Sequence, residues 1–271
     1  MSPDKKEPGE FGWLIEGINT ANTIPLLVAG QAVNVWAALF QDWDRQHNNT
    51  IKPKLDELLP FSSGDMELMN IPIPTLRGSA TKKGKILKET IHDPFDRCAP
   101  ADHSIWELQG PDGGEYLVQV MNRLEGTSKA DLLKNTVRAK LSENGTVELP
   151  DPIALLPGKT ANLLKFDQKP RQDLRHCQML VCCTHAFLGA ECENPEIPPR
   201  KILADLERLH LFSRTPRAKK VSAEYGIMWE GCYPIAQIAT RAHSDPKLQN
   251  WLDHREHRKE KKKTDTPIQM A

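Results

Sequence analysis

The chain lacks the features that mark secreted disulfide scaffolds, membrane proteins and strongly charged binding proteins. Its six cysteines include no CxxC pair and form no framework of the kind that small secreted domains use. No apolar run approaches the roughly 18 residues of a membrane span, and the polar N-terminus lacks the apolar core of a signal peptide. Lysine plus arginine and aspartate plus glutamate number 36 each, so net charge indicates no polyanionic partner. We therefore predict a cytoplasmic protein without membrane association.

Cysteines and histidines crowd one short segment, which raises the question of a metal site. The segment holds Cys177, Cys182 and Cys183 together with two histidines. A tetrahedral zinc site needs ligands from at least two segments, and one helix rarely supplies them. We expect reduced, mostly buried cysteines that pack as small hydrophobic side chains.

The composition and its change along the chain predict an α+β fold with distinct parts. With 271 residues, of which 39% are hydrophobic and 27% charged, the chain is long enough to bury a core. The predicted parts, in chain order, are a disordered lead-in (residues 1–10), an α+β core with a small mixed sheet and flanking helices (11–150), a helical C-terminal region (151–257) and a basic disordered tail (258–271). The tail begins within a run of six lysines or arginines against two glutamates at residues 254–263. Such a run usually marks a solvated terminus, and a weak tether to a phosphate backbone is the alternative.

Hydrophobic periodicity and turn residues predict the individual elements of the core. Residues 23–30 form a buried strand that ends at a glycine, and residues 31–43 have the apolar spacing of a helix. The segments expected to be extended or turned are a loop or sheet edge with two prolines at 71–78, strands at 86–92, 103–109 and 115–121, and a hairpin turn at 111–114. A helix capped by Thr127 or Ser128 is expected to run to Lys140.

An acidic pair in the segment LPFSSGDMELM (residues 59–69) is the main candidate for chemistry. If the segment is extended, Asp65 and Glu67 lie on one face and Met66 and Leu68 on the other. Two neighbouring carboxylates repel unless a cation lies between them, and Mg²⁺ prefers oxygen ligands. The alternative is an exposed strand edge with two solvated acids.

The tripeptide Gly158-Lys159-Thr160 suggests a phosphate-binding loop, but the rest of that motif is missing. The motif requires a glycine five residues before Gly158, where the chain has Ile153. The preceding segment also lacks the pattern of a strand. We therefore reject a P-loop.

Taken together, several segments resemble the nucleotidyltransferases of the DNA polymerase β superfamily, in particular the minimal nucleotidyltransferase and abortive-infection toxin-like group. LLVAGQAVNVWAALF (residues 26–40) and LPFSSGDMELM resemble the strand–glycine–helix element and the acidic pair of that group. EYLVQVMNRLEG (residues 115–126) resembles the strand of the third acid. Residues 155–188 are similar to the helical stretch that follows, in which a lysine precedes a basic Arg-Gln-Asp-x-x-His segment.

The resemblance implies a metal-dependent transfer of a nucleotidyl group from a nucleoside triphosphate to an RNA, in particular tRNA, or to a protein side chain. Asp65 and Glu67 would hold Mg²⁺ or Mn²⁺ and serve as the catalytic acids. The residues implied in nucleotide binding are Gly30, Gln31, Ser63 and Lys159, and those implied in acceptor contacts are Lys165, Lys169, Arg171 and Arg175. Resemblance to toxin systems also implies a cognate inhibitor protein as a partner.

Two positions depart from the family pattern. The first glycine of the double glycine is Ala29, which costs little if its backbone angle is ordinary. The third acid is Gln119, an amide that ligates a metal weakly and cannot act as a base. Asp112 and Glu115 are not favoured as substitutes, because they lie in or beside the turn. The alternatives to an enzyme are a non-catalytic module of this fold that binds nucleotide, RNA or protein, and an unrelated α+β protein.

Overall fold

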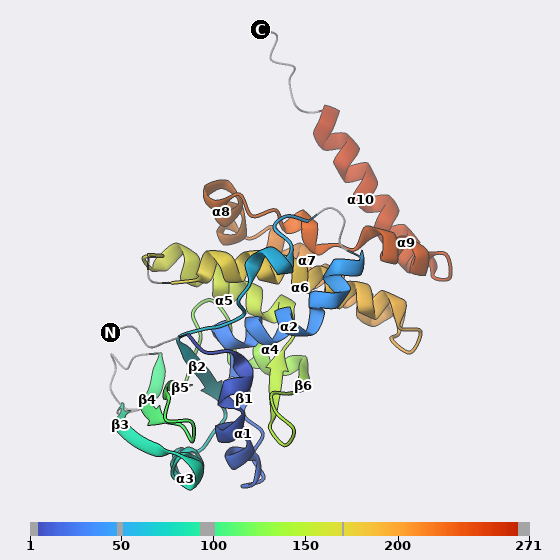
Figure 1. Cartoon of the computed structure of the whole chain (residues 1–271). Helices are drawn as coiled ribbons and strands as arrows, with labels where there is room; N and C mark the ends of the chain where they lie inside the picture. Colours follow the sequence, from blue (N-terminus) through green and yellow to red (C-terminus); the bar gives the residue numbers. More distant parts are fainter. Residues whose placement is uncertain (1–4, 48–50, 93–100, 170, 265–271) are drawn as a thin grey trace.

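A computed structural model describes residues 5–47, 51–92, 101–169 and 171–264, with side chains described up to Arg255 (Figure 1). These residues form a mixed α/β structure around a seven-stranded sheet. The strands are β1 Leu26–Val28, β2 Asp65–Met69, β3 Lys85–Ile91, β4 Asp102–Gln109, β5 Glu115–Met121, β6 Thr136–Lys140 and β7 Thr146–Pro150. The α-helices are α1 Gly12–Asn19, α2 Ala29–His47, α3 Ile73–Lys83, α4 Lys129–Lys134, α5 Pro152–Lys165, α6 Asp173–Glu193, α7 Pro199–Ser213, α8 Pro216–Tyr225, α9 Ile235–Ala242 and α10 Pro246–Thr264.

The sheet places the strand of the acidic pair near its centre. The strand order is β3-β4-β5-β2-β1-β7-β6, with β2 parallel to β5 and antiparallel to β1. In this register Glu67 lies opposite Val28 of β1 on one side and Gln119 of β5 on the other. The central strands are the most buried, whereas the edge strands β3 and β6 carry exposed charged side chains. Short strands and edge charges are common protection against edge-to-edge association.

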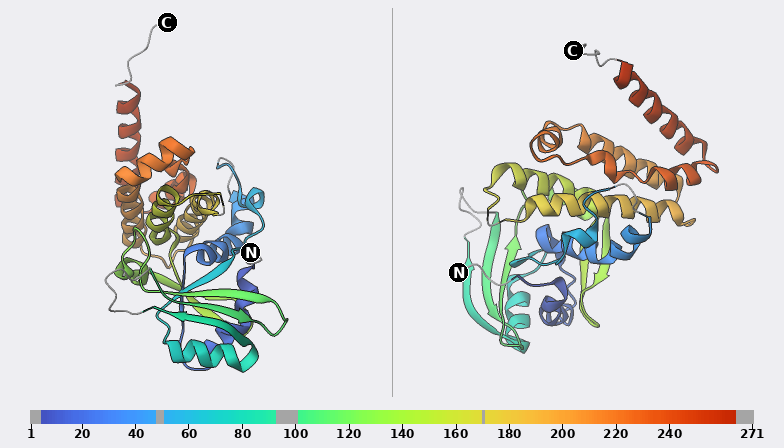
Figure 2. Two further views of the ribbon diagram at one scale, coloured as in Figure 1. Left: turned by 90° about the vertical axis from the view of Figure 1, so that its left-hand side faces the viewer. Right: turned by 45° about the horizontal axis from the view of Figure 1, so that its top comes forward.

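The helix α2 joins the sheet to the C-terminal helices. It lies between the sheet and α6, while α10 projects away from the body (Figures 1 and 2). The approach of α2 and α6 requires a glycine, because a Cβ atom at Gly189 would lie 2.3 Å from the Trp43 ring. Nearer the start of α2, the rings of Trp36 and Phe40 stack with their centroids 5.3 Å apart, and Trp36 Nε1 donates to the Pro150 carbonyl oxygen at 2.8 Å.

One hydrophobic core crosses the predicted boundary at residue 150. The buried cluster includes Met66 and Trp106 of the sheet as well as Leu206 of α7. A polar link lies at the same boundary: Asp151 caps α5 by accepting from the Ala154 N–H at 2.8 Å, and Arg208 of α7 donates to both oxygens of the same carboxylate. Hydrophobic packing and this ion pair therefore both connect the helices to the sheet.

Most predicted elements of the core are confirmed. The structure has the strands expected near residues 86–92, 103–109 and 115–121, and α2 extends through the expected helix at 31–43. The hairpin turn at 111–114 joins β4 to β5, and Gly113 takes φ +79°, a conformation that glycine adopts without steric cost. The strand β1 is shorter than predicted, because α2 begins at Ala29.

Two predictions about elements are wrong. Residues 73–83 form α3, where prolines suggested a loop or an edge. Pro72 is the N-cap and Pro74 lies in the first turn, where a missing N–H costs no hydrogen bond. The helix expected up to Lys140 ends at Lys134, and the rest becomes β6, paired with β7. Ser128 does cap α4, by accepting from the Asp131 N–H at 3.1 Å.

Both predicted disordered ends are partly ordered. The Lys6 backbone pairs with that of Ser63, through N–H to carbonyl distances of 2.8 and 3.0 Å in the two directions. At the other end, α10 continues to Thr264, past the predicted start of the tail at residue 258. Residues 1–4 and 265–271 lie outside the described residues.

None of the helices that the structure describes combines the length and the apolarity needed to cross a bilayer.

Replacing Asp151 by alanine should lower the free energy of unfolding more than the loss of an ordinary helix cap does. It removes the cap of α5 and one carboxylate partner of the partly buried Arg208, so we expect the free energy of unfolding to fall by about 2–4 kcal/mol. The matched control is Thr215→Ala, which removes a cap without an ion pair from α8 and should cost about 1 kcal/mol. Urea unfolding measures both values. Equal losses in the two variants would show that the ion pair does not stabilise the fold.

Candidate functional site

The two acids of the predicted pair lie on the same face of β2. The burial pattern of β2 alternates, with Met66 and Leu68 buried and Asp65 and Glu67 partly exposed. The expected arrangement of the pair is therefore present. Because β2 is a central strand, the alternative of an exposed strand edge with two solvated acids is wrong.

The start of α2 contacts the pair through the backbone of Gly30. Its N–H donates to Glu67 Oε2 at 3.1 Å. Ala29, which precedes it, has φ +54°, in the left-handed region that costs a non-glycine residue about 1–2 kcal/mol. The condition under which alanine would cost little here, an ordinary backbone angle, is thus not met. The chain turns sharply here from β1 into α2, and this turn brings the Gly30 N–H to Glu67.

The N-terminal segment and the loop before β2 fix the other acid. Ser63 donates from Oγ to Asp65 Oδ1 at 3.1 Å, and its backbone is paired with Lys6. Gln31, a predicted nucleotide contact, is fully buried. Its amide nitrogen donates to the Lys6 carbonyl at 2.9 Å and its oxygen accepts from Asn34 at 3.1 Å. The side chain of Gln31 therefore holds the N-terminal segment against the site.

A buried ion pair lies beside the acids. Lys159 of α5 is 5% exposed, and its Nζ is 3.1 Å from Asp173 Oδ1 at the start of α6. Arg171 approaches the other oxygen of Asp173, with Nε 2.5 Å from Oδ2. Burial acts to raise the pKa of Asp173, but Lys159 and Arg171 outweigh it and hold this pKa below its usual value. Lys159 is therefore not a solvated surface lysine, because its side chain is buried and paired.

The environment disfavours the charge of Glu67. Burial and the negative charge of Asp65 raise the pKa of Glu67 to about 7. Lys159, the Gly30 N–H and Arg171 act in the opposite direction without cancelling the shift. A carboxylic acid with a pKa near neutrality, beside a second carboxylate, is typical of a functional site.

The neighbour of the pair on β5 is an amide. Gln119 lies directly opposite Glu67 in the parallel ladder, and Leu117 lies opposite Asp65. Among the described residues there is no group of three or more His, Cys, Asp or Glu side chains that could hold a metal ion. The described structure therefore has an amide at the position expected for the third acid, and Asp173 nearby is engaged by Lys159 and Arg171.

The four predicted acceptor contacts divide into two pairs. Lys165 is exposed and pairs with Glu125 at 2.7 Å, and Lys169 is exposed as well. Arg171 lies at the ion pair described above. Arg175 donates from Nε to the Leu58 carbonyl at 2.8 Å. Arg171 thus lies near the acidic pair and Arg175 lies against the segment before β2, whereas the two lysines lie on the surface.

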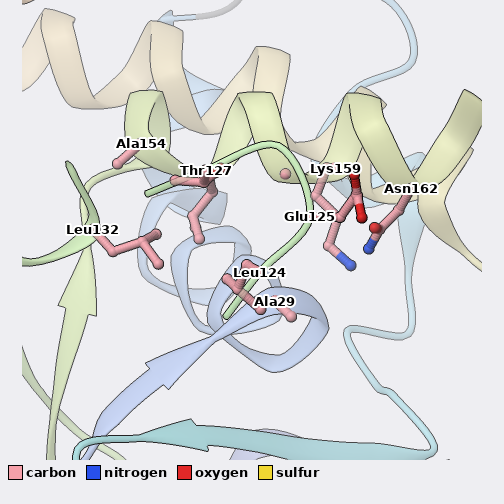
Figure 3. Close-up of a pocket in the computed structure, with 10 residues that line it drawn as sticks. Ala29, Leu124, Glu125, Thr127, Leu132, Ala154, Lys159 and Asn162 are labelled. Carbon is pink, nitrogen blue, oxygen red and sulfur yellow. The ribbon is translucent and has the colours of Figure 1, made fainter. Parts of the chain in front are cut away.

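A small cavity lies between the start of α2, α5 and the loop after β5 (Figure 3). Its volume is about 20 Å³, room for roughly one water molecule and far too little for a nucleotide. Figure 3 shows Lys159 and Asn162 projecting from α5 toward this loop. Gly126 allows the close contact: it has φ +74°, and a Cβ atom there would lie 2.8 Å from the Pro157 carbonyl oxygen.

Two residues near the pair had no role assigned from the sequence, namely Asp173 and His176. Both belong to the basic Arg-Gln-Asp-x-x-His segment, and the cluster of charged and histidine residues there was the feature of the sequence that could have indicated a role for them. His176 lies against the start of α2: a Cβ atom at Gly30 would be 3.2 Å from His176 Cε1 and 3.0 Å from Ser63 Oγ. Ser63 and His176 therefore pack closely against Gly30, and a larger residue at this position would require one of them to shift.

The described cysteines are packed thiols. The five that the structure describes are free and buried, and burial raises the pKa of each: Cys177, Cys182, Cys183, Cys192 and Cys232. The prediction of reduced, buried cysteines is confirmed for these five. Cys98 lies outside the described residues.

No protein-family model matches this chain, and no curated protein matches it. A function for this protein is therefore inferred from the geometry of the site.

Replacing Glu67 by glutamine should stabilise the metal-free protein at high pH. The folded-state pKa is raised from 4.5 to about 7, so the folded protein loses stability as pH rises between these values. We expect Glu67→Gln to be more stable than the wild type by about 1–3 kcal/mol at pH 8, with the advantage absent near pH 4. Urea unfolding with a chelator present measures this.

The control variant should change the stability in the opposite direction. Glu57 is exposed, and a hydrogen bond from Lys52 lowers its pKa. Glu57→Gln should therefore give a small loss of stability at pH 8. If Glu67→Gln behaves in the same way, Glu67 is an ordinary solvated carboxylate.

Proposed function

We propose that the protein is a metal-dependent nucleotidyltransferase of the DNA polymerase β superfamily. It transfers a nucleotidyl group from a nucleoside triphosphate to an RNA, in particular tRNA, or to a protein side chain. The acceptor oxygen forms a bond to the α-phosphorus, the bond from this phosphorus to the bridging oxygen breaks, and pyrophosphate leaves with that electron pair. The proton of the acceptor hydroxyl is released to solvent.

One observation supports this proposal most strongly. Asp65 and Glu67 share a face of a central strand, and the Gly30 N–H at the start of a helix donates to one of them. This arrangement combines two oxygen ligands with a helix N-terminus, where phosphate groups bind favourably.

The donor set fits a hard divalent cation. Two carboxylates supply oxygen ligands. Burial and repulsion from Asp65 raise the pKa of Glu67, and a bound cation would favour the charged form against both effects. Asp65 and Glu67 would hold Mg²⁺ or Mn²⁺, which supplies positive charge against the triphosphate when it is bound.

The chain's own groups orient the acids and balance charge. The Gly30 N–H and the Ser63 hydroxyl each fix one carboxylate of the pair. Lys159 and Arg171 are held in place by Asp173, next to the acids, and bring positive charge toward the phosphates. Because these groups are anchored before a substrate arrives, little reorganisation would be needed on binding.

The second candidate is a non-catalytic module of the same fold that binds nucleotide, RNA or a protein partner. The observation in its favour is Gln119, a neutral amide directly opposite Glu67. An amide neither carries the charge of a third acid nor accepts the proton of an attacking hydroxyl.

Label transfer separates the two candidates. The full-length protein is incubated with Mg²⁺ or Mn²⁺, labelled triphosphates, and total RNA and protein extracts. We expect label on one acceptor class, with Asp65→Asn lowering transfer at least about a hundredfold because the metal loses a charged ligand. Asp56→Asn, which alters an exposed acid paired with Arg45, is the matched control and should leave transfer unchanged.

The result that contradicts the enzyme is nucleotide binding without transfer to any acceptor. In that case Gln119→Asp, which restores a third carboxylate opposite Glu67, is the informative variant. A gain of transfer in this variant would identify a nucleotidyltransferase fold that has lost its chemistry.

A further inference from the structure

His176 is a buried side chain that the fold leaves without a hydrogen-bond partner. It lies on α6, is 3% exposed, and neither Nδ1 nor Nε2 has a partner among the described residues. Leaving a buried polar group unpaired costs about 1–3 kcal/mol. Such a group calls for a specific explanation, and a bound ligand is one.

The ring faces the part of the site where a phosphate would lie. Its Cε1 atom, which is flanked by both ring nitrogens, is the part nearest to Gly30. The Ser63 hydroxyl borders the same place, and Gly30 lies in the first turn of α2. An unpaired imidazole, a hydroxyl and a helix N-terminus therefore converge on one small region.

The charges around His176 also favour an anion. Burial lowers the pKa of His176 well below its usual value, and the cations Lys159, Arg175, Arg171 and Lys5 lower it further, so the ring is neutral at pH 7. Lys159 and Arg171 share the single carboxylate of Asp173, and Arg175 makes no ion pair within the described residues. One nitrogen of Arg175, Nη2, is buried and has no hydrogen-bond partner there either. Two neighbouring donors on α6 thus lack partners.

A second histidine on the same helix shows how the fold treats a structural one. His185 is also buried, and its Nδ1 is 2.9 Å from the carbonyl oxygen of Gly231. The two buried histidines of α6 thus differ, because His185 has an internal partner and His176 has none among the described residues. His185 also supplies a matched control.

We propose that His176 binds the nucleotide: one of its ring N–H groups donates to a phosphate oxygen of the triphosphate, beside Gly30 and Ser63. This inference rests on the proposed function and assigns a phosphate-binding residue to the same site. It requires no particular base, because the contact is to phosphate.

Inorganic tripolyphosphate with Mg²⁺ tests the contact without knowledge of the base or the acceptor. Its binding to the full-length protein is measured by calorimetry at pH 7, together with the free energy of unfolding of each variant. We expect His176→Phe to weaken binding by about tenfold to a hundredfold, the effect of losing one hydrogen bond to a charged group. Its stability should be equal to or higher than that of the wild type, because no internal hydrogen bond is lost.

The control and the rescue variants should behave differently. His185→Phe should lower stability and leave binding of tripolyphosphate unchanged, because it loses the contact to Gly231 away from the site. Of His176→Asn and His176→Gln, which keep an amide donor, at least one should bind more tightly than His176→Phe.

Two results would overturn the inference, and they have different meanings. If the wild type binds tripolyphosphate and His176→Phe binds it equally well, His176 is not a phosphate ligand, while the proposed function stands. If the wild type does not bind tripolyphosphate at all, the nucleotide site itself is wrong and the inference fails with it.

Discussion

The repulsion between two carboxylates on one strand face is the constraint on which the site depends. Asp65 and Glu67 are side by side on β2, and burial adds to the repulsion by raising the pKa of Glu67 to about 7. Two like charges held side by side destabilise the folded protein unless a cation lies between them. The surroundings instead hold both acids in place, through the Gly30 N–H and the Ser63 hydroxyl. Stability given up in this way is typical of sites that bind a cation or perform chemistry.

The rest of the fold supplies the positions that this site needs. The turn at Ala29 adopts a left-handed angle so that α2 begins beside Glu67. The helices α5 and α6 bring Lys159 and Asp173 together near the acidic pair. The hydrophobic core that joins these helices to the sheet is continuous. The N-terminal segment also takes part, because Lys6 pairs with Ser63, whose hydroxyl donates to Asp65. Elements from both halves of the chain therefore converge on one place.

The sequence predicted the acidic pair well, because alternation in a strand depends only on local geometry. The hairpin at residues 111–114 and the helix α2 were predictable for the same reason, as turn residues and apolar spacing act over a few positions. What the sequence could not indicate depends on long-range contacts. The strand β6 forms by pairing with β7, and Lys159 is buried because Asp173 lies against it. Pro72 and Pro74 led to the wrong prediction of a loop or edge, because proline breaks a helix in its interior but is tolerated at the N-cap and in the first turn. The missing partner of His176 likewise follows from packing rather than from the residue type.

The most direct measurement of the central claim is the number of protons released when Mn²⁺ binds. If the cation lies between Asp65 and Glu67, it must displace the proton that Glu67 holds with a pKa of about 7. The account predicts that the wild type releases close to one proton per bound Mn²⁺ at pH 6, about half a proton at pH 7 and almost none at pH 8.5, and that Asp65→Asn loses this pattern. If Mn²⁺ fails to bind, or binds without releasing protons at pH 6, Asp65 and Glu67 do not bind a divalent cation between them, and the central claim is contradicted.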